Sequence, residues 1–250
     1  MKPPIAVQLY SVREACAEDF AGSLARIADM GYVGVEFAGL HNQTPLQVRA
    51  MLDDLGLVAC STHGAFPTAE TLAEAVATAQ ILGYTYLVGG WGPPQFASIE
   101  EIQKVAAEAE AAFALTQGTG LKLGLHNHYW EFDHMLDGRY PHDIFMELAP
   151  NMLAELDTYW VKVGGADPAA QIAKLGKRAP LLHIKDGPGV KEKAMMAIGT
   201  GIVDWPPVFA AATAAEWMIV ELDSCDTDMF QALADSYSFL VGNGYASGNK

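Results

Sequence analysis

Short apolar segments alternate along the whole chain with longer segments of helical periodicity. The longer segments include FAGSLARIADMG and TLAEAVATAQILG, in which apolar residues recur about every 3.6 positions. The short segments that are typical of buried strands are residues 5–10, 33–37, 57–62, 85–90, 121–126, 152–157, 181–185 and 218–223. A strand followed by a helix, repeated eight times within 250 residues, predicts an α/β fold of the (β/α)8 TIM barrel type.

Helix ends and chain organisation support one barrel domain. Gly31, Gly56 and Gly83 each follow a helical segment, where a left-handed residue commonly ends a helix, and Asp204 precedes two prolines as an expected N-cap. A doubly wound sheet is the structural alternative, but it would usually place a glycine-rich phosphate turn after its first strand. We expect a single domain over residues 1–250, with a frayed polar tail at about 243–250.

The charge and the cysteines restrict the environment and the partners. Lys and Arg number 15 against 30 Asp and Glu, so the net charge of −15 argues against nucleic acid and against an anionic membrane surface. The three cysteines form no CxxC pair, which fits a reducing compartment. The N-terminal residues lack the pattern of a signal peptide, and no apolar run approaches the roughly 20 residues that span a bilayer. We therefore expect a cytoplasmic protein.

Ionisable residues follow most of the predicted strands, where a TIM barrel has its active site. They are Glu36, His63, His126, His128, Glu131, Asp157, His183, Lys185, Glu221 and Asp223. Burying so many ionisable groups in one place is costly unless they are paired or bind a metal. Carboxylates and imidazoles without thiolates predict a site for Mn²⁺, Mg²⁺, Co²⁺ or Zn²⁺ rather than a structural zinc centre, and the number of carboxylates favours Mn²⁺ or Mg²⁺.

The segment LGLHNHYWEF, residues 123–132, is dense in candidate proton carriers. A neutral imidazole near its reference pKa of about 6.5 is a competent base, so His126 and His128 are candidate catalytic bases, with a hydrogen-bonded core histidine as the alternative. Further substrate contacts are expected from the residues that follow other strands. These are His63, Lys185, Glu36, Trp91 and Trp160. For the tryptophans, core packing is the alternative to stacking on a sugar.

Seven motifs give the chain a family resemblance from about residue 5 to residue 242. They are VQLYSVR, IADMGYVGVEF, HNHYWEF, LAELDTYW, HIKDG, IGTGIVDWPPVF and WMIVELD. In this order they resemble the xylose isomerase-like sugar phosphate isomerase/epimerase family of metal-dependent TIM barrels.

The resemblance implies four metal ligands, Glu, Asp, His and Glu, from strands five to eight. Asp157, His183 and Glu221 match the last three ligands. The strand-five position holds His126 where many members have glutamate, so Glu131 is the expected first ligand and His126 the alternative.

The resemblance also implies a reaction. We expect a divalent-metal-dependent isomerase or epimerase that acts on a ketose, an inosose or a keto-sugar derivative. It would abstract a proton next to the carbonyl through a metal-stabilised enediolate, with His126, His128, Glu131 and Glu221 as catalytic residues. A lyase or dehydratase, a non-catalytic sugar-binding barrel and an apurinic-site endonuclease are alternatives, and the acidic charge speaks against the endonuclease. The sequence leaves the oligomeric state open, with a homodimer as one possible state because barrels of this kind often pair.

Overall fold

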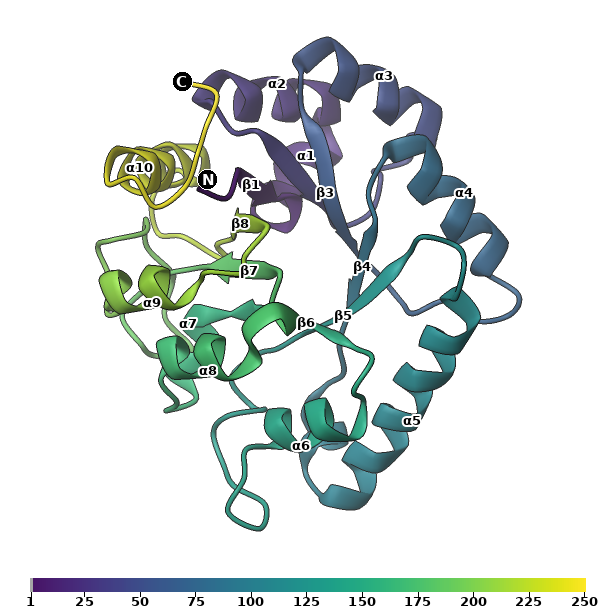
Figure 1. Ribbon diagram of the computed structural model, residues 1–250. Helices are drawn as coiled ribbons and strands as arrows, with labels where there is room; N and C mark the ends of the chain where they lie inside the picture. Colours follow the sequence, from purple (N-terminus) through teal and green to yellow (C-terminus); the bar gives the residue numbers. More distant parts are fainter. Residues whose placement is uncertain (1) are drawn as a thin grey trace.

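The computed structural model describes residues 2–250 and has a closed barrel of parallel strands in sequence order, ringed by helices (Figure 1). Its strands are β1 (Ile5–Gln8), β2 (Gly34–Phe37), β3 (Val58–His63), β4 (Tyr86–Gly89), β5 (Lys122–His126), β6 (Leu153–Asp157), β7 (Leu181–Ile184) and β8 (Trp217–Val220). Each begins within one residue of its predicted start, so the TIM barrel prediction is confirmed.

Helices separate the strands along the chain and pack outside the barrel (Figure 1). They are α1 (Arg13–Glu18), α2 (Phe20–Met30), α3 (Pro45–Leu55), α4 (Leu72–Leu82), α5 (Ile99–Thr116), α6 (Pro141–Leu148), α7 (Thr158–Val163), α8 (Pro168–Leu175), α9 (Trp205–Ala211) and α10 (Met229–Gly242). Short 3₁₀ turns are η1 (Leu9–Val12), η2 (Pro93–Phe96) and η3 (Gly176–Arg178). Gly31, Gly56 and Gly83 end α2, α3 and α4 in the left-handed conformation, as predicted. Asp204 precedes α9, but its side chain makes no capping hydrogen bond.

The barrel interior is layered. The layer towards the N-terminal ends of the strands is apolar and comprises Ala6, Cys60, Tyr86, Val88, Leu181 and Ile219. Strand register places polar residues beside one another in the layer above, where Gln8 pairs with Glu36 and His126 with Glu155. Partners in a parallel pair project from the same side of the sheet, so this register brings the polar groups together at one end of the barrel.

A β-bulge adjusts the alignment of β2 and β3. Val35 pairs with Ala59, whereas Glu36 pairs with Ser61, so Cys60 is the additional residue in β3. The extra residue shifts the following side chains along the strand. As a result, the Ser61 hydroxyl donates a 2.5 Å hydrogen bond to Glu36 Oε2.

The C-terminal tail packs against the start of the barrel, which differs from the frayed tail expected for residues 243–250. The Ile5 amide donates to the Ser247 carbonyl at 3.0 Å, and the Ser247 amide donates to the Pro3 carbonyl at 2.9 Å. Ala246 is buried. These contacts satisfy backbone groups at the start of β1 that would otherwise need water.

None of the helices within residues 2–250 combines the length and the apolar character needed to cross a membrane.

Candidate active site

A cavity of about 470 Å³ lies at the C-terminal ends of the strands, where TIM barrels have their active sites. Its walls are formed by Tyr10, Ala38, His63, Gly64, His126, His128, Lys185, Glu221 and Asp223. The lining therefore contains imidazoles, carboxylates and an ammonium group from elements far apart in sequence.

One group of side chains below this cavity has the geometry of a cation site. Ligand atoms of His126, Asp157, His183 and Glu221 all lie within 4.8 Å of one another, and all four residues are buried. Asp157 Oδ2, His183 Nδ1 and Glu221 Oε2 have no well-aligned hydrogen-bond partner, although His183 Nδ1 is 2.8 Å from Glu221 Oε2. Buried carboxylate and imidazole atoms without partners are costly, and a divalent cation would satisfy them. The donor set therefore fits a metal.

The Asp157 carboxylate is held in place by the start of α7. Its Oδ1 accepts a 2.8 Å hydrogen bond from the Trp160 amide as the helix N-cap, which leaves Oδ2 facing His126 Nε2 at 4.0 Å. Burial raises the pKa of Asp157 to about 6, although Lys185 and His183 oppose the shift. One oxygen of Asp157 thus caps α7, and the other remains available to the candidate site.

Lys185 already places positive charge among these carboxylates. Its Nζ lies 3.1 Å from Asp157 Oδ2, 2.6 Å from Glu221 Oε2 and 2.8 Å from Asp223 Oδ1. Burial lowers the pKa of Lys185, but the three carboxylates outweigh burial and raise the pKa well above its usual value. Burial raises the pKa of Glu221, but Lys185 and His183 outweigh it and lower the pKa. The cluster thus favours cations.

Glu131, the first ligand expected from the sequence, lies outside this group of four. It is fully buried, and its Oε2 accepts a 2.9 Å hydrogen bond from the His128 amide. Its Oε1 has no hydrogen-bond partner, and burial raises the pKa of Glu131 well above its usual value. His126, which the sequence left open as the alternative, occupies the fourth position beside Asp157.

Glu36 and Glu155 lie beneath the cavity and do not line it. Glu36 accepts hydrogen bonds from Gln8 Nε2 and Ser61 Oγ, and its Oε1 is 3.0 Å from His183 Nε2. This differs from the substrate contact expected for Glu36, because both of its oxygens are engaged inside the barrel. Gln8 and Glu155 were not among the residues predicted from the sequence, although Glu155 lies two residues before Asp157 and hence on the same face of β6.

The pKa values of Glu36 and Glu155 are shifted in opposite directions. Burial raises the pKa of Glu36, but the neighbouring His63 and His183 outweigh burial and lower it well below its usual value. Burial and the Glu36 charge raise the pKa of Glu155, against the effect of the same two imidazoles. Glu36 therefore ionises at a lower pH than Glu155.

The imidazoles that line the cavity differ in charge. His63 Nε2 lies 2.5 Å from Glu155 Oε2 and 2.9 Å from Glu36 Oε1. Burial lowers the pKa of His63, but the two carboxylates outweigh burial and raise the pKa to about 10. His128 stacks on Trp130, with ring centroids 4.1 Å apart, and burial lowers its pKa to about 3. The cavity therefore combines a protonated His63 with a neutral His128.

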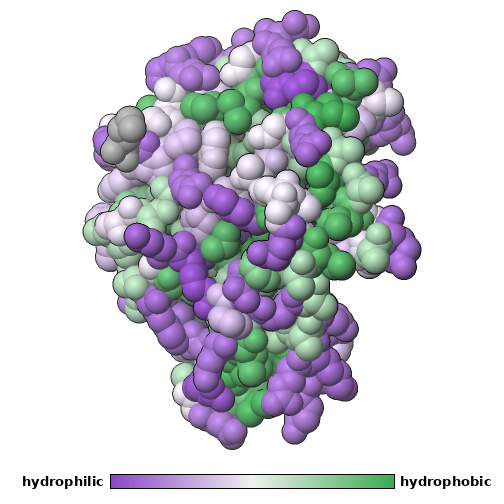
Figure 2. All heavy atoms as spheres, turned by 45° about the vertical axis from the view of Figure 1, so that its right-hand side comes forward, coloured by the Kyte–Doolittle hydropathy of each residue, from purple (hydrophilic) through white to green (hydrophobic). Residues whose placement is uncertain are grey.

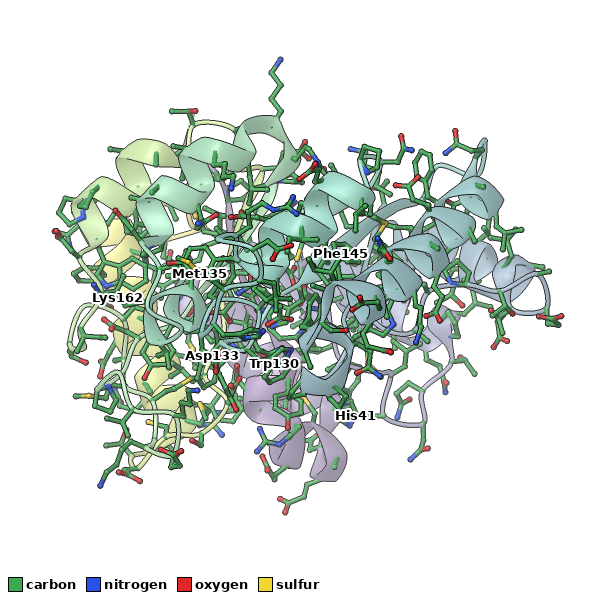
Figure 3. All side chains as sticks on the ribbon, turned by 90° about the horizontal axis from the view of Figure 1, so that it is seen from below. His41, Trp130, Asp133, Met135, Phe145 and Lys162 are labelled. Atoms are coloured by element: carbon green, nitrogen blue, oxygen red, sulfur yellow. The ribbon has the colours of Figure 1, made fainter. Side chains whose placement is uncertain are left out.

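The β5–α6 segment, which carries His128, is held by contacts with Lys191. Figure 3 labels Trp130 and Asp133 on this segment. Lys191 pairs with Asp133 at 3.0 Å and lies over the Tyr129 ring at 3.7 Å. These contacts hold the loop that carries His128.

Trp91 and Trp160, expected to contact substrate, do not line the cavity at the C-terminal ends of the strands. Trp91 packs against Phe66 and Phe145, and Trp160 is buried against Tyr159. Core packing, the alternative considered from the sequence, describes both tryptophans better. Trp91 borders a second, apolar cavity of about 520 Å³ between the β3–α4 loop and α5. Hydrophobic side chains are exposed on the side of the molecule that carries α4 and α5, which faces the viewer in Figure 2.

Comparisons with known proteins agree with this architecture. Residues 24–240 match the family model described as xylose isomerase-like TIM barrel. An inosose dehydratase of Geobacillus kaustophilus is 26% identical over 245 residues, covering 80% of this chain and 79% of the relative. A sugar phosphate isomerase/epimerase from Parabacteroides distasonis has a TM-score of 0.82 at 23% identity, covering 99% and 96% of the two chains. A crystal structure of an IolI protein with a binding zinc atom has a TM-score of 0.73 at 13% identity, covering 99% and 100%.

Proposed function

Because this chain belongs to the xylose isomerase-like TIM barrel family, we propose that it is a divalent-metal-dependent isomerase or epimerase of a keto-sugar. Proteins of similar fold include sugar isomerases, epimerases and dehydratases. The observation that carries the proposal is the convergence of buried ligand atoms of His126, Asp157, His183 and Glu221 next to a polar cavity.

The metal would be held by His126, Asp157, His183 and Glu221. Two carboxylates and two imidazoles suit Mn²⁺, Co²⁺ and Zn²⁺, and a protein of the same fold binds zinc. When bound, such a cation would polarise the carbonyl oxygen of the substrate as a Lewis acid.

Two imidazoles of the cavity wall are placed to carry protons. In this proposal His128, which is neutral, accepts a proton from the carbon next to the carbonyl, and His63, which is protonated, donates one. Pairing pKa values of about 3 and about 10 makes the first a weak base and the second a weak acid in the metal-free site. His63 is held through Nε2 by Glu155, so its ring keeps a fixed orientation towards the cavity. Return of the proton to the neighbouring carbon gives isomerisation, and return to the opposite face of the same carbon gives epimerisation.

The charge of the lining favours a substrate without a phosphate group. Lys185 is paired with three carboxylates and His63 with two, so neither has a free charge for a phosphate. Glu221 and Asp223 add negative charge to the same wall. We therefore propose an uncharged polyhydroxylated ketone, such as a ketose or an inosose, as the substrate.

Dehydration is the second candidate function, and the inosose dehydratase relative favours it. Removal of the same proton, followed by loss of a hydroxyl group from the next carbon, would give an unsaturated ketone and water. His63 would then protonate the departing hydroxyl.

The test is proton exchange in deuterated water, with protein loaded in turn with Mn²⁺, Co²⁺ and Zn²⁺ and mixed with a panel of ketoses and inososes. Deuterium incorporation or a new sugar isomer, followed by NMR, supports the isomerase. A product with enone absorbance supports the dehydratase. Asp157→Asn should abolish either signal, and the absence of exchange with every substrate and metal would refute both candidates.

A further inference from the structure

The candidate metal ligands form two overlapping groups. His126 and His183 belong to the group with Asp157 and Glu221, and also to a deeper group with His63 and Glu155. Each shared imidazole presents a different nitrogen to each group. His183 Nδ1 lies 2.8 Å from Glu221 Oε2, whereas its Nε2 lies 3.0 Å from both Glu36 Oε1 and Glu155 Oε2.

His126 repeats this arrangement with its nitrogens exchanged. Its Nδ1 lies 3.3 Å from Glu155 Oε2 without a well-aligned hydrogen bond, and its Nε2 lies 4.0 Å from Asp157 Oδ2. In a neutral imidazole, one nitrogen carries the proton and the other offers a lone pair. A carboxylate on one side holds the N–H there, so the opposite nitrogen becomes the ligand.

We propose that Glu36 and Glu155 are positioning residues that hold the N–H sides of His183 and His126, so that the opposite nitrogens face Asp157 and Glu221 as metal ligands. The inference rests on the proposed function, because it assigns roles towards the same cation.

Glu36 is itself fixed by its neighbours. Gln8 from β1 donates through Nε2 to Oε1, and Ser61 from β3 donates to Oε2 at 2.5 Å. With both oxygens held, the carboxylate keeps its orientation towards His183 Nε2. The bulge in β3 therefore acts on the metal ligand through Ser61 and Glu36.

A second cation in the deeper group is the competing explanation. It would require His183 or His126 to lose both ring protons and bridge two metals. It would also have to displace His63 Nε2 from Glu155, where the two atoms are 2.5 Å apart. Both oxygens of Glu36 are hydrogen-bonded and Glu155 Oε2 is held by His63, whereas Glu155 Oε1 and His126 Nδ1 have no hydrogen-bond partner. Because a second cation would have to displace His63, we expect one cation for each chain.

The experiment measures the affinity of the full chain for Co²⁺ and Zn²⁺ by competition with a chelator. Glu36→Gln and Glu155→Gln should each weaken binding about 10–100-fold, because they remove a carboxylate behind a ligand histidine. Glu216→Gln is the matched control, since it removes a carboxylate that hydrogen-bonds Tyr86 elsewhere in the molecule, and it should bind like the wild type.

Two further measurements separate positioning from loss of folding. Ser61→Ala retains both carboxylates but frees Glu36, and it should weaken binding by a smaller factor. In the zinc-loaded wild type, imidazole NMR should place the remaining proton of His183 on Nε2. The proposal is overturned if both glutamine variants bind within twofold of the wild type, if His183 carries its proton on Nδ1, or if two equivalents of cation bind.

The outcomes also separate this proposal from the proposed function. Stoichiometric binding that weakens as expected, without any proton exchange on keto-sugars, would refute the activity and leave the positioning role intact. A wild-type chain that binds no divalent cation would refute both.

Discussion

Lys185 and Asp157 form a fully buried ion pair, in which the ammonium nitrogen lies 3.1 Å from Oδ2. The same oxygen belongs to the candidate metal ligands, so the ammonium and a metal attract the same carboxylates. Lys185→Met should therefore destabilise the metal-free protein by about 3–5 kcal/mol, since it leaves buried carboxylates without their partner. Added Zn²⁺ or Mn²⁺ should restore much of this loss.

Thermal unfolding with chelator and with excess metal checks the prediction. The metal-induced rise in melting temperature should be larger for Lys185→Met than for the wild type. Lys191→Met is the control, because Lys191 pairs with Asp133 at a partly exposed site. Identical metal-induced shifts in all three proteins would contradict competition between Lys185 and the metal.

The choice between His126 and Glu131 as the fourth ligand gives a second prediction. His126→Gln should weaken metal binding at least tenfold, because the ligand group loses an imidazole. Glu131→Gln should bind metal like the wild type, because Glu131 lies outside the group and its Oε2 serves the His128 amide. Isothermal titration with Co²⁺ measures both affinities. The reverse order would restore Glu131 as the ligand, as the sequence suggests.

The strands, the barrel and much of the site are predictable from the sequence, because each strand-end residue is local to an apolar segment. Alternation along β6 could also have identified Glu155, since it shares a face with Asp157. Which oxygen or nitrogen faces which partner is not local information. The contact of Glu36 with His183 joins residues 147 positions apart and depends on barrel closure.

The bulge explains another limit of prediction from sequence. Strict alternation would not place Ser61 and His63 correctly relative to Glu36, because Cys60 adds a residue to β3. The expected roles of Glu36, Trp91 and Trp160 changed for a similar reason. Each follows or ends a strand, but the sequence does not specify whether the side chain reaches the cavity or packs beneath or outside it.

Asp186 gives a third prediction, in the segment after β7. Its buried carboxylate accepts hydrogen bonds from five N–H groups, those of Gly187, Gly199, Gly201, Val203 and the Trp205 indole. Asp186→Asn should lower the free energy of unfolding by at least about 3 kcal/mol, because an amide nitrogen would face N–H donors in place of a charged acceptor. Urea unfolding measures the loss. Asp204→Asn is the matched control and should change stability by less than about 0.5 kcal/mol, because its side chain caps no helix bond.

His142 gives a prediction about pH that is independent of the metal. The side chain is fully buried against Phe132, and neither ring nitrogen has a hydrogen-bond partner within residues 2–250. Burial lowers its pKa to about 4 from the ordinary value of 6.5. Between these two pH values the unfolded chain binds a proton on His142 that the folded chain does not. The folded state therefore loses stability relative to the unfolded state as the pH falls. With respect to His142, the free energy of unfolding should be at its maximum above about pH 6.5. It should fall by about 3 kcal/mol as the pH approaches 4.

His142→Phe should remove this dependence, because a neutral ring of similar shape can stack on Phe132 in place of the imidazole. Urea unfolding at pH 7.5 and pH 4.5 measures the change in stability for each protein. The wild type should lose about 2–3 kcal/mol more than His142→Phe between these two values. His134→Gln controls for loss of a histidine from a less buried position and should follow the wild type. Equal losses in the wild type and His142→Phe would show that His142 stays protonated within the core or that its burial is relieved by local opening.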